Sequence, residues 1–221
     1  MIRLGTRRRV DKPRCRRHAC RMCNLYRMSS SYTELARLFA VPAPETSNAG
    51  KLIYPGLPGI VLANGALRSM TWGFPLSRRG KSGQALKPKP VNNTRTDKLD
   101  SRFWNANFRD RRALIPVTAF AEAEGPRGTM TRTWFADPTD EMLTCAGIWR
   151  DSAEWGPVYS MLMTDANSQV KPVHDRMPVI IAAADRATYV NGAEDDAHKL
   201  CEPYATELAI DRTNDPWVRR S

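Results

Sequence analysis

The sequence predicts an α+β fold in which a mainly antiparallel, barrel-like β-sheet is flanked by peripheral helices. Many short apolar runs of strand length are separated by turn residues, and the helical segments between them are few and short. The chain lacks the regular strand–helix alternation that builds a parallel sheet. With 221 residues, of which 42% are hydrophobic, it can fold as one domain with a sizeable core or as two small ones. We expect a single domain over residues 22–215.

A basic leader precedes that domain. Residues 1–21 hold nine of the 34 Lys and Arg residues and one acid, so the leader carries +8 of the net +11 and leaves only +3 for residues 22–221. The leader has no apolar core of the kind that a secretory signal needs. We expect that it is a mis-assigned start or is removed, and that Met22 is the true first residue. Since the domain itself is only mildly basic, net charge gives weak support for a nucleic-acid partner.

Cysteine usage indicates a reducing, cytoplasmic setting, because the number is odd and the spacing irregular. The cysteines are Cys15, Cys20, Cys23, Cys145 and Cys201. Three of them crowd together with His18 near the start, which raises the possibility of a metal cluster. Structural zinc sites join two separated ligand pairs, however, and no second pair follows. We therefore expect no metal and no organic cofactor. No run of about 18 apolar residues suits a membrane span, so we expect no membrane partner.

The first half of the domain contains clear local signals. Ser31 and Glu34 form a capping box before an apolar helix face that ends at Pro42. Asn64-Gly65 lies between apolar runs at 60–62 and 67–70 and predicts a tight hairpin. Residues 77–90 are polar, basic and rich in proline, so we expect an exposed loop. Residues 101–110 have the pattern of a helix.

The second half is read mainly as strands. We predict strands at 113–117, 131–136, 142–149, 158–164, 179–182 and 207–210. A short helix is expected from Asn167 to Pro172. Two more are expected from Asp185 to about residue 190 and from 194 to 201.

Cys23 draws attention because of what a cysteine can do at a free N-terminus. There the α-amine, with a pKa of about 7.7–8.0, stands beside a thiol with a pKa of about 8.5. An aldehyde can condense with the amine to an imine, and the thiolate can then close onto the same carbon as a five-membered ring. An internal cysteine cannot do this, because its nitrogen is an amide. The alternative is that Cys23 is an ordinary buried thiol.

Polar residues elsewhere could complete a site. Glu122 follows an apolar strand between small residues, where burial would raise its pKa and make it an acid or base near neutrality; otherwise it is a solvated acid at a strand end. His174 lies on a loop with Arg176 two residues on, which suits proton transfer and phosphate binding unless the loop is a surface turn. Asn93 and Arg95 alternate on one extended face, where they could hold an amine and a phosphate, or be ordinary loop polarity.

Several short motifs occur in a specific order. They are Met-Cys-Asn-Leu-Tyr at 22–26, Trp-Gly at 72–73, Asn-Thr-Arg at 93–95, Ile-Pro followed by Phe-x-Glu between 115 and 122, Ala-Gly-Ile-Trp at 146–149, Thr-x-Ala-Asn at 164–167 and His-Asp-Arg-Met-Pro at 174–178. With this order and spacing the chain resembles the SRAP family (SOS-response-associated peptidase), the abasic-site processing proteins, over about residues 22 to 210.

The resemblance implies a covalent DNA chemistry. Cys23, freed as the N-terminus, would capture the ring-opened sugar aldehyde of an abasic site in single-stranded DNA as a thiazolidine and so shield the lesion. Asn93 would hold the Cys23 amine, Glu122 would act as acid and base in ring opening and reversal, and His174 would assist proton transfer. The family is also credited with removing its own leader, so lyase and peptidase activities are expected. We expect a cytoplasmic monomer that joins the nucleoid when bound to DNA.

The resemblance also assigns DNA contacts. Arg95 and Arg176 would bind phosphates that flank the lesion. Trp72 would stack on bases, a contact typical of single-strand binding, or else be a core tryptophan. One departure concerns the segment 119–123, where many members have Gly-Phe-Tyr-Glu-Trp and this chain has Ala-Phe-Ala-Glu-Ala. The acid is kept but two aromatic residues beside it are lost.

Two other functions remain open from the sequence. A cysteine peptidase or amidase would use Cys23 as a nucleophile with His174 and Glu122, and would tolerate a blocked α-amine. A non-catalytic single-strand binding module would use the cationic and aromatic contacts alone, and its binding would be released by salt.

Overall fold

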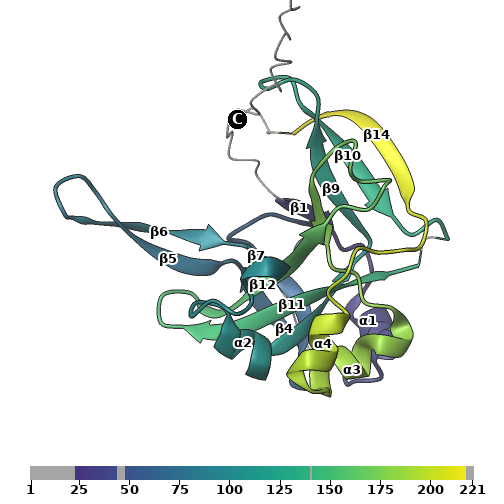
Figure 1. The fold of residues 1–221 in the computed structure, drawn as a ribbon, viewed down its shortest axis with the longest axis horizontal. Coiled ribbons are helices and arrows are strands. Elements are labelled where there is room, and N and C mark those ends of the chain that lie inside the picture. Colours follow the sequence, from purple (N-terminus) through teal and green to yellow (C-terminus); the bar gives the residue numbers. More distant parts are fainter. Residues whose placement is uncertain (1–22, 44–47, 140, 218–221) are drawn as a thin grey trace, which may run out of the picture.

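A closed β-barrel organises the molecule, as the computed structural model describes it over residues 23–43, 48–139 and 141–217 (Figure 1). Five strands pair in a ring in the order β11-β8-β3-β4-β12, and β12 pairs back to β11. Their bounds are β3 (Pro58–Ala63), β4 (Ala66–Trp72), β8 (Arg112–Val117), β11 (Leu143–Ser152) and β12 (Gly156–Asp165). The predicted α+β, mainly antiparallel and barrel-like fold is confirmed.

Two short strands extend the barrel beside β12. Strand β7 (Asn93–Arg95) pairs with it in parallel, and β13 (Arg176–Pro178) pairs with it in antiparallel orientation. Both motifs that carry candidate arginines therefore hydrogen-bond to one strand.

A second sheet brings the N-terminal part of the domain to the barrel. Its antiparallel order is β14-β10-β9-β1-β2. The bounds are β1 (Leu25–Arg27), β2 (Leu52–Ile53), β9 (Ala119–Glu124), β10 (Thr131–Ala136) and β14 (Ala209–Pro216). Leu25 lies opposite Ala121, so Cys23, two residues before Leu25, falls beside the part of β9 that carries Glu122.

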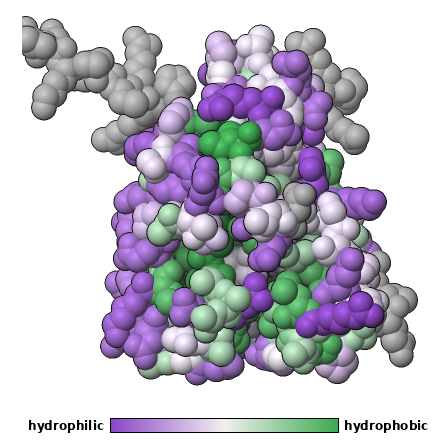
Figure 2. Space-filling model, turned by 90° about the vertical axis from the view of Figure 1, so that its right-hand side faces the viewer, coloured by the Kyte–Doolittle hydropathy of each residue, from purple (hydrophilic) through white to green (hydrophobic). Residues whose placement is uncertain are grey.

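The core is divided by the barrel wall. Along β12, Tyr159 and Met161 belong to the larger apolar cluster, whereas Val158 and Leu162 belong to a second cluster. This alternation follows the two-residue period of a strand, and both faces are buried. The second cluster includes Tyr189, in one of the short helices that cover the outer face of the barrel. On the side that carries β14, Figure 2 shows hydrophilic residues around scattered apolar areas.

The helices are short and peripheral. Helix α1 (Tyr32–Phe39) has the predicted capping box, in which Ser31 N–H donates to Glu34 at 2.7 Å and Glu34 N–H donates to Ser31 Oγ at 3.3 Å. The others are α2 (Asn105–Asp110), α3 (Arg186–Asn191), α4 (Glu194–Lys199) and the 3₁₀ turns η1 (Thr96–Lys98) and η2 (Ala183–Asp185). Within the described residues, none of the helices is long and apolar enough to cross a membrane.

Some predicted boundaries are wrong. The helix expected over 101–110 begins only at Asn105, after a series of turns. The helix expected from Asn167 to Pro172 is replaced by a series of turns. Asn167 accepts hydrogen bonds from the N–H groups of Gln169 and Val170, as a helix N-cap does, but Pro172 has no N–H to continue a helical ladder. The strand expected at 179–182 lies earlier, as β13, with only an isolated bridge at Ile180.

The exposed loop expected over 77–90 is instead a two-stranded arm. Strands β5 (Phe74–Arg79) and β6 (Ala85–Val91) pair with each other and project from the barrel (Figure 1). The turn between them is closed by Gly80 N–H donating to the carbonyl of Gln84 at 2.8 Å, with Gly83 at a φ of +81° that favours glycine. The prolines of this segment favour a loop in the sequence. The structure accommodates them in strands because the arm has only two strands, and the outer edge of each strand donates no N–H group to a neighbour.

Candidate active site

Two asparagine side chains hold the backbone of Cys23. Asn93 Nδ2 donates to the Cys23 carbonyl at 2.6 Å, and Asn92 Nδ2 donates to the same oxygen at 3.1 Å. Asn92 also donates to Asn24 Oδ1 at 3.1 Å. Asn93 was predicted as a site residue and Asn92 was missed, although the Asn-Asn pair at 92–93 was the available signal. The segment that leads into β7 therefore fixes where Cys23 lies.

Glu122 is fully buried and belongs to the interior of β9, so it is not a solvated acid at a strand end. Burial raises the pKa of its carboxyl well above the ordinary 4.5, and the backbone N–H of Cys23 opposes this only in part. Neither carboxylate oxygen has a hydrogen bond of normal geometry to the described residues. The environment thus favours the neutral acid, which can donate a proton.

The Cys23 thiol is held in its neutral form. Its Sγ donates to the carbonyls of Leu25 at 3.6 Å and Ala121 at 3.7 Å. Burial, followed by the charge of Glu122, raises the thiol pKa well above 9.0. A thiol in such surroundings is a poor thiolate nucleophile.

The Asn93 side chain has an unused acceptor. Its Oδ1 is buried and has no hydrogen-bond partner among the described residues, although its Nδ2 is bound to Cys23. Buried polar atoms are nearly always paired. The Oδ1 can therefore accept a hydrogen bond from a donor group at this position.

Arg95 and Arg176 lie on one face, on either side of β12. Arg95 is opposite Met163 on β12, and Arg176 is opposite Asp165. Met163 and Asp165 are two residues apart and so face the same way, as do Asn93 and Arg95 on β7. The register therefore places both arginines on the face from which Asn93 reaches Cys23.

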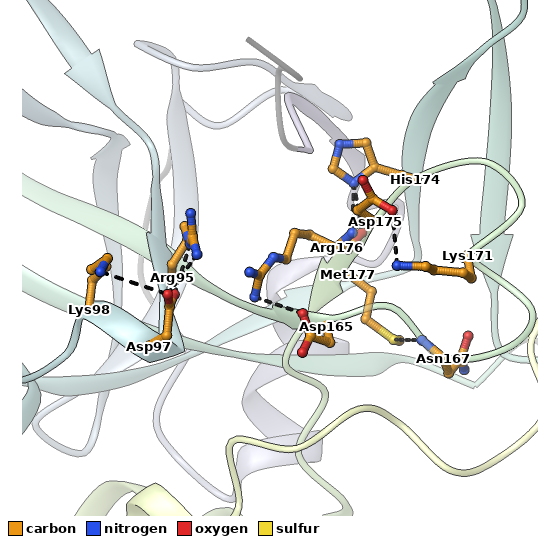
Figure 3. Close-up of polar contacts among 10 residues, drawn as sticks. All are labelled: Arg95, Asp97, Lys98, Asp165, Asn167, Lys171, His174, Asp175, Arg176 and Met177. Carbon is orange, nitrogen blue, oxygen red and sulfur yellow. Dashed lines mark hydrogen bonds and ion pairs between the residues drawn. The ribbon is translucent and has the colours of Figure 1, made fainter. Parts of the chain in front are cut away.

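Both arginines are ion-paired (Figure 3). Arg95 makes two hydrogen bonds to Asp97, at 2.8 and 2.6 Å, and Arg176 contacts Asp165 at 3.0 Å. The pKa of Asp97 is lowered, first by its hydrogen bond to Arg95 and more weakly by the charges of Arg176 and Lys98. The side chains of the first pair are 41% and 45% exposed. Such solvated pairs are weak, so a phosphate can replace a carboxylate there.

His174 lies in a fixed, buried position before β13. Its side chain is not on a surface turn, since the residue is 7% exposed. Nδ1 is 3.0 Å from the N–H of Arg176 and 2.9 Å from its carbonyl oxygen, and the His174 N–H donates to Val170. The imidazole and the Arg176 strand are thus oriented together, as Figure 3 shows.

Trp72 is a core residue. It has no exposed surface, and its ring packs edge-on against Tyr26 at 5.1 Å and parallel to Tyr159 at 6.4 Å. Its Nε1 donates to the Asn92 carbonyl at 2.8 Å. No face of the ring is open for a base to stack on in this structure. What Trp72 does for the site is to fix Asn92, which in turn holds Cys23.

The neighbouring strand β10 supplies an aromatic residue where the segment 119–123 lacks the two aromatic residues of many family members. Trp134 on β10 lies directly opposite Ala121 and packs in the same small cluster, which also contains Leu25. Arg27 lies over the Trp134 ring at 4.3 Å. An aromatic wall is therefore present next to β9, although it comes from β10.

A metal centre has no basis in the part of the chain that the structure describes. No group of three or more His, Cys, Asp or Glu side chains in these residues could hold a metal ion. Cys15, His18 and Cys20, which crowd together in the sequence, lie outside the described residues.

Comparisons with known proteins define the family. The sequence matches the model of the SOS response associated peptidase (SRAP) family over residues 22–215. The chain therefore belongs to the SRAP family. No curated protein matches the sequence.

Solved structures of several bacterial proteins share the fold. A protein from Bordetella bronchiseptica has a TM-score of 0.74 at 20% identity, covering 86% of this chain and 99% of its own. A protein from Bacteroides thetaiotaomicron has a TM-score of 0.69 at 15% identity, with coverages of 86% and 91%. A phage-related protein from B. bronchiseptica has a TM-score of 0.65 at 17% identity, with coverages of 90% and 95%. At these identities the likeness concerns the fold alone.

Proposed function

We propose that Cys23, as a free N-terminal residue, crosslinks to the ring-opened sugar aldehyde of an abasic site in single-stranded DNA. The product is a thiazolidine that shields the lesion. Family membership supports this function. The observation that carries it is the setting of Cys23, whose carbonyl is held by two amides while its thiol is kept neutral beside a buried, unpaired carboxyl.

The first step uses the α-amine. It adds to the aldehyde carbon, and loss of water from the carbinolamine gives an imine. Glu122 supplies the proton to the departing hydroxyl, a role that its raised pKa suits. Asn93 Oδ1, which lacks a donor among the described residues, accepts a hydrogen bond from the amine and orients it.

The second step uses the thiol. Sulfur bonds to the imine carbon, the C=N electron pair moves to nitrogen, and the thiol proton is passed to that nitrogen. The overall change is aldehyde plus aminothiol giving thiazolidine plus water. In this route sulfur adds after the imine has formed, because the imine carbon is the atom that it attacks. His174 serves proton transfer, and Arg95 and Arg176 hold the flanking phosphates.

This chemistry requires that Cys23 carry a free amine, so residues 1–22 are absent from the active form. Initiation at Met22 followed by methionine removal, or cleavage of a longer chain, would produce it. The peptidase alternative would use the same thiol for direct attack on an amide and would need no free amine, so blocking the amine separates the two.

A denaturing-gel assay on an oligonucleotide with one abasic site tests the proposal. The chain starting at Met22 and the full chain are compared, and the intact mass of each identifies its N-terminus. We expect a shifted band only from protein that begins at Cys23, and none after Cys23→Ser or after acetylation of the amine. A band that survives the blocked amine would rule out the imine route. Binding that survives Cys23→Ala, is released by salt and gives no band would support the binding module instead.

A further inference from the structure

The β5–β6 arm grows directly out of the candidate site. Strand β5 follows Gly73, whose N–H donates to the Tyr159 carbonyl at 2.7 Å. Strand β6 ends at Val91, and the next two residues, Asn92 and Asn93, hold the Cys23 carbonyl. Both ends of the arm are therefore fixed at the place where a lesion would be bound. A strand that leaves the site on this side must pass the arm.

The arm carries charge of one sign. Residues 74–91 contain five cations and no acid, and all five cations are exposed. They are Arg78, Arg79, Lys81, Lys87 and Lys89. None of the five has an ion pair with any residue that the structure describes. This differs from Arg95 and Arg176, whose charges are paired with aspartates. A narrow ribbon with unneutralised cations attracts a polyanion.

The strand register distributes the cations over both faces of the arm. Leu76 lies opposite Lys89, and Arg79 lies opposite Ala85. From the first pair to the pair of Arg78 and Leu86, β5 advances by two residues and β6 by three, so the extra residue lies in β6 and interrupts its alternation. Arg78 and Lys89 therefore share one face, and Arg79 lies on the other. An irregularity between Leu76 and Arg78 shifts the pairing, so that Arg78 lies opposite Leu86. Without this shift Arg78 would face Lys87 directly, which is an unfavourable like-charge pair.

Two exposed apolar residues lie on the arm among its cations. Leu76 is 45% exposed and Leu86 is 38% exposed. The register puts both on the face that carries Arg78 and Lys89. The arm ends next to the residues that hold Cys23, so the polyanion within its reach is a strand bound at that site.

We propose that the β5–β6 arm binds the phosphate backbone of the DNA strand next to the lesion, outside the Cys23 site. The identity of the polyanion rests on the proposed function. The contact is electrostatic and independent of base sequence, and it extends the bound length of strand along the exposed cations of the arm.

The test measures non-covalent affinity for an undamaged single-stranded oligonucleotide by fluorescence anisotropy at several salt concentrations. The arm variant is Arg79→Gln, Lys87→Gln and Lys89→Gln. A matched control removes three exposed charges from the helices with Arg37→Gln, Arg109→Gln and Lys199→Gln. A charge-preserving arm variant, Arg79→Lys, Lys87→Arg and Lys89→Arg, keeps the cations and changes their shape. Anionic phospholipid vesicles provide the second ligand.

We expect the arm variant to bind the strand about ten- to a hundredfold more weakly, with the salt slope reduced by about 2, because three phosphate contacts are lost. The control and the charge-preserving variant should stay within about threefold of the wild type. Equal binding by the arm and control variants would overturn the proposal, as would loss of vesicle binding alone. The undamaged strand forms no crosslink, so this result is independent of the abasic-site assay.

Discussion

The candidate site has two halves that differ in their contact with water. In the inner half, Cys23 and Glu122 are fully buried and Asn93 nearly so, and the Asn93 and Glu122 side-chain oxygens have no hydrogen-bond partner among the described residues. In the outer half, Arg95 and Arg176 are partly exposed and each is paired with an aspartate. The inner half therefore contains buried oxygens without hydrogen-bond partners among the described residues, whereas the charges of the outer half are neutralised by ion pairs.

Under the proposed function, the inner half carries out the reaction and the outer half positions the DNA. Buried polar atoms without partners cost free energy, so they persist where the surrounding sheet fixes them and where a substrate group can pair with them. Solvated ion pairs cost little, and a phosphate can take the place of a carboxylate at small expense. Substitutions in the inner half should therefore change rates strongly, whereas those in the outer half should change affinity modestly.

The largest effect is expected for Glu122→Gln, which keeps the shape of the side chain and removes its proton. The rate of crosslink formation should fall by about a hundredfold, a typical contribution of a general acid. Single-turnover crosslinking at saturating abasic DNA measures this rate. Asp110→Asn, which changes an exposed acid on α2, serves as a control. An unchanged rate in Glu122→Gln would mean that the inner half does not supply the proton.

A second effect of the same residue concerns stability. The folded protein keeps the Glu122 proton to a higher pH than the unfolded chain, whose pKa is near the ordinary 4.5. As pH rises from there through the raised folded pKa, the free energy of unfolding falls by up to about 1.4 kcal/mol per pH unit. Urea unfolding between pH 5 and pH 8 should show Glu122→Gln gaining stability relative to the wild type as pH increases. Parallel pH curves for the two proteins would contradict the raised pKa.

In the outer half, Arg176→Gln should weaken binding of an abasic oligonucleotide about three- to tenfold and reduce the salt slope by about 0.7, as expected for one lost phosphate contact. The crosslinking rate at saturating DNA should change less than the affinity. Lys171→Gln, in the turns before β13 and likewise paired with an aspartate, Asp175, is the comparison. A rate loss as large as that of Glu122→Gln would show that the two halves are not separate.

The smallest change is expected for Asp97→Asn, which frees Arg95 from its bidentate partner. Affinity for single-stranded DNA should rise by up to about threefold, because phosphate no longer competes with a carboxylate. Anisotropy titrations at low salt provide the measurement. Weaker binding would indicate that Asp97 serves mainly to orient Arg95.

Local signals predicted much of the fold. The capping box at Ser31 appears as expected, because short-range hydrogen bonding decides it. The strand over 131–136 also appears as expected, because its Thr, Trp and Phe residues are typical of strands. The arm was not predicted, because proline and charged residues are typical of loops. They also occur in edge strands, but the sequence does not show which strands lie at an edge. The expected helix after Asn167 does not continue, because the cap at Asn167 forms but Pro172 has no N–H for the next helical hydrogen bond.

The sequence identified site residues that belong to short motifs. It did not show the surroundings of those residues, because the pairing of strands decides them. The sequence placed Glu122 at a strand end, and only the register with β1 and β10 shows that it is fully buried. The sequence left open whether Trp72 stacks on bases or lies in the core. Its packing against Tyr26 and Tyr159 places it in the core. Asn92 became relevant only when its distance to the Cys23 carbonyl was known.

Strand β12 also has a consequence for synthesis of the protein. It pairs with β7 and β13, which carry the candidate arginines, and it closes the barrel against β4 and β11. The ribosome makes Cys23 near the start of the domain and completes β12 about 140 residues later, roughly ten to thirty seconds afterwards at common elongation rates. Until then the barrel cannot close, and under the proposed function a newly exposed aminothiol would meet small cellular aldehydes without its protein shelter. Closure of the barrel therefore completes the fold and also buries Cys23.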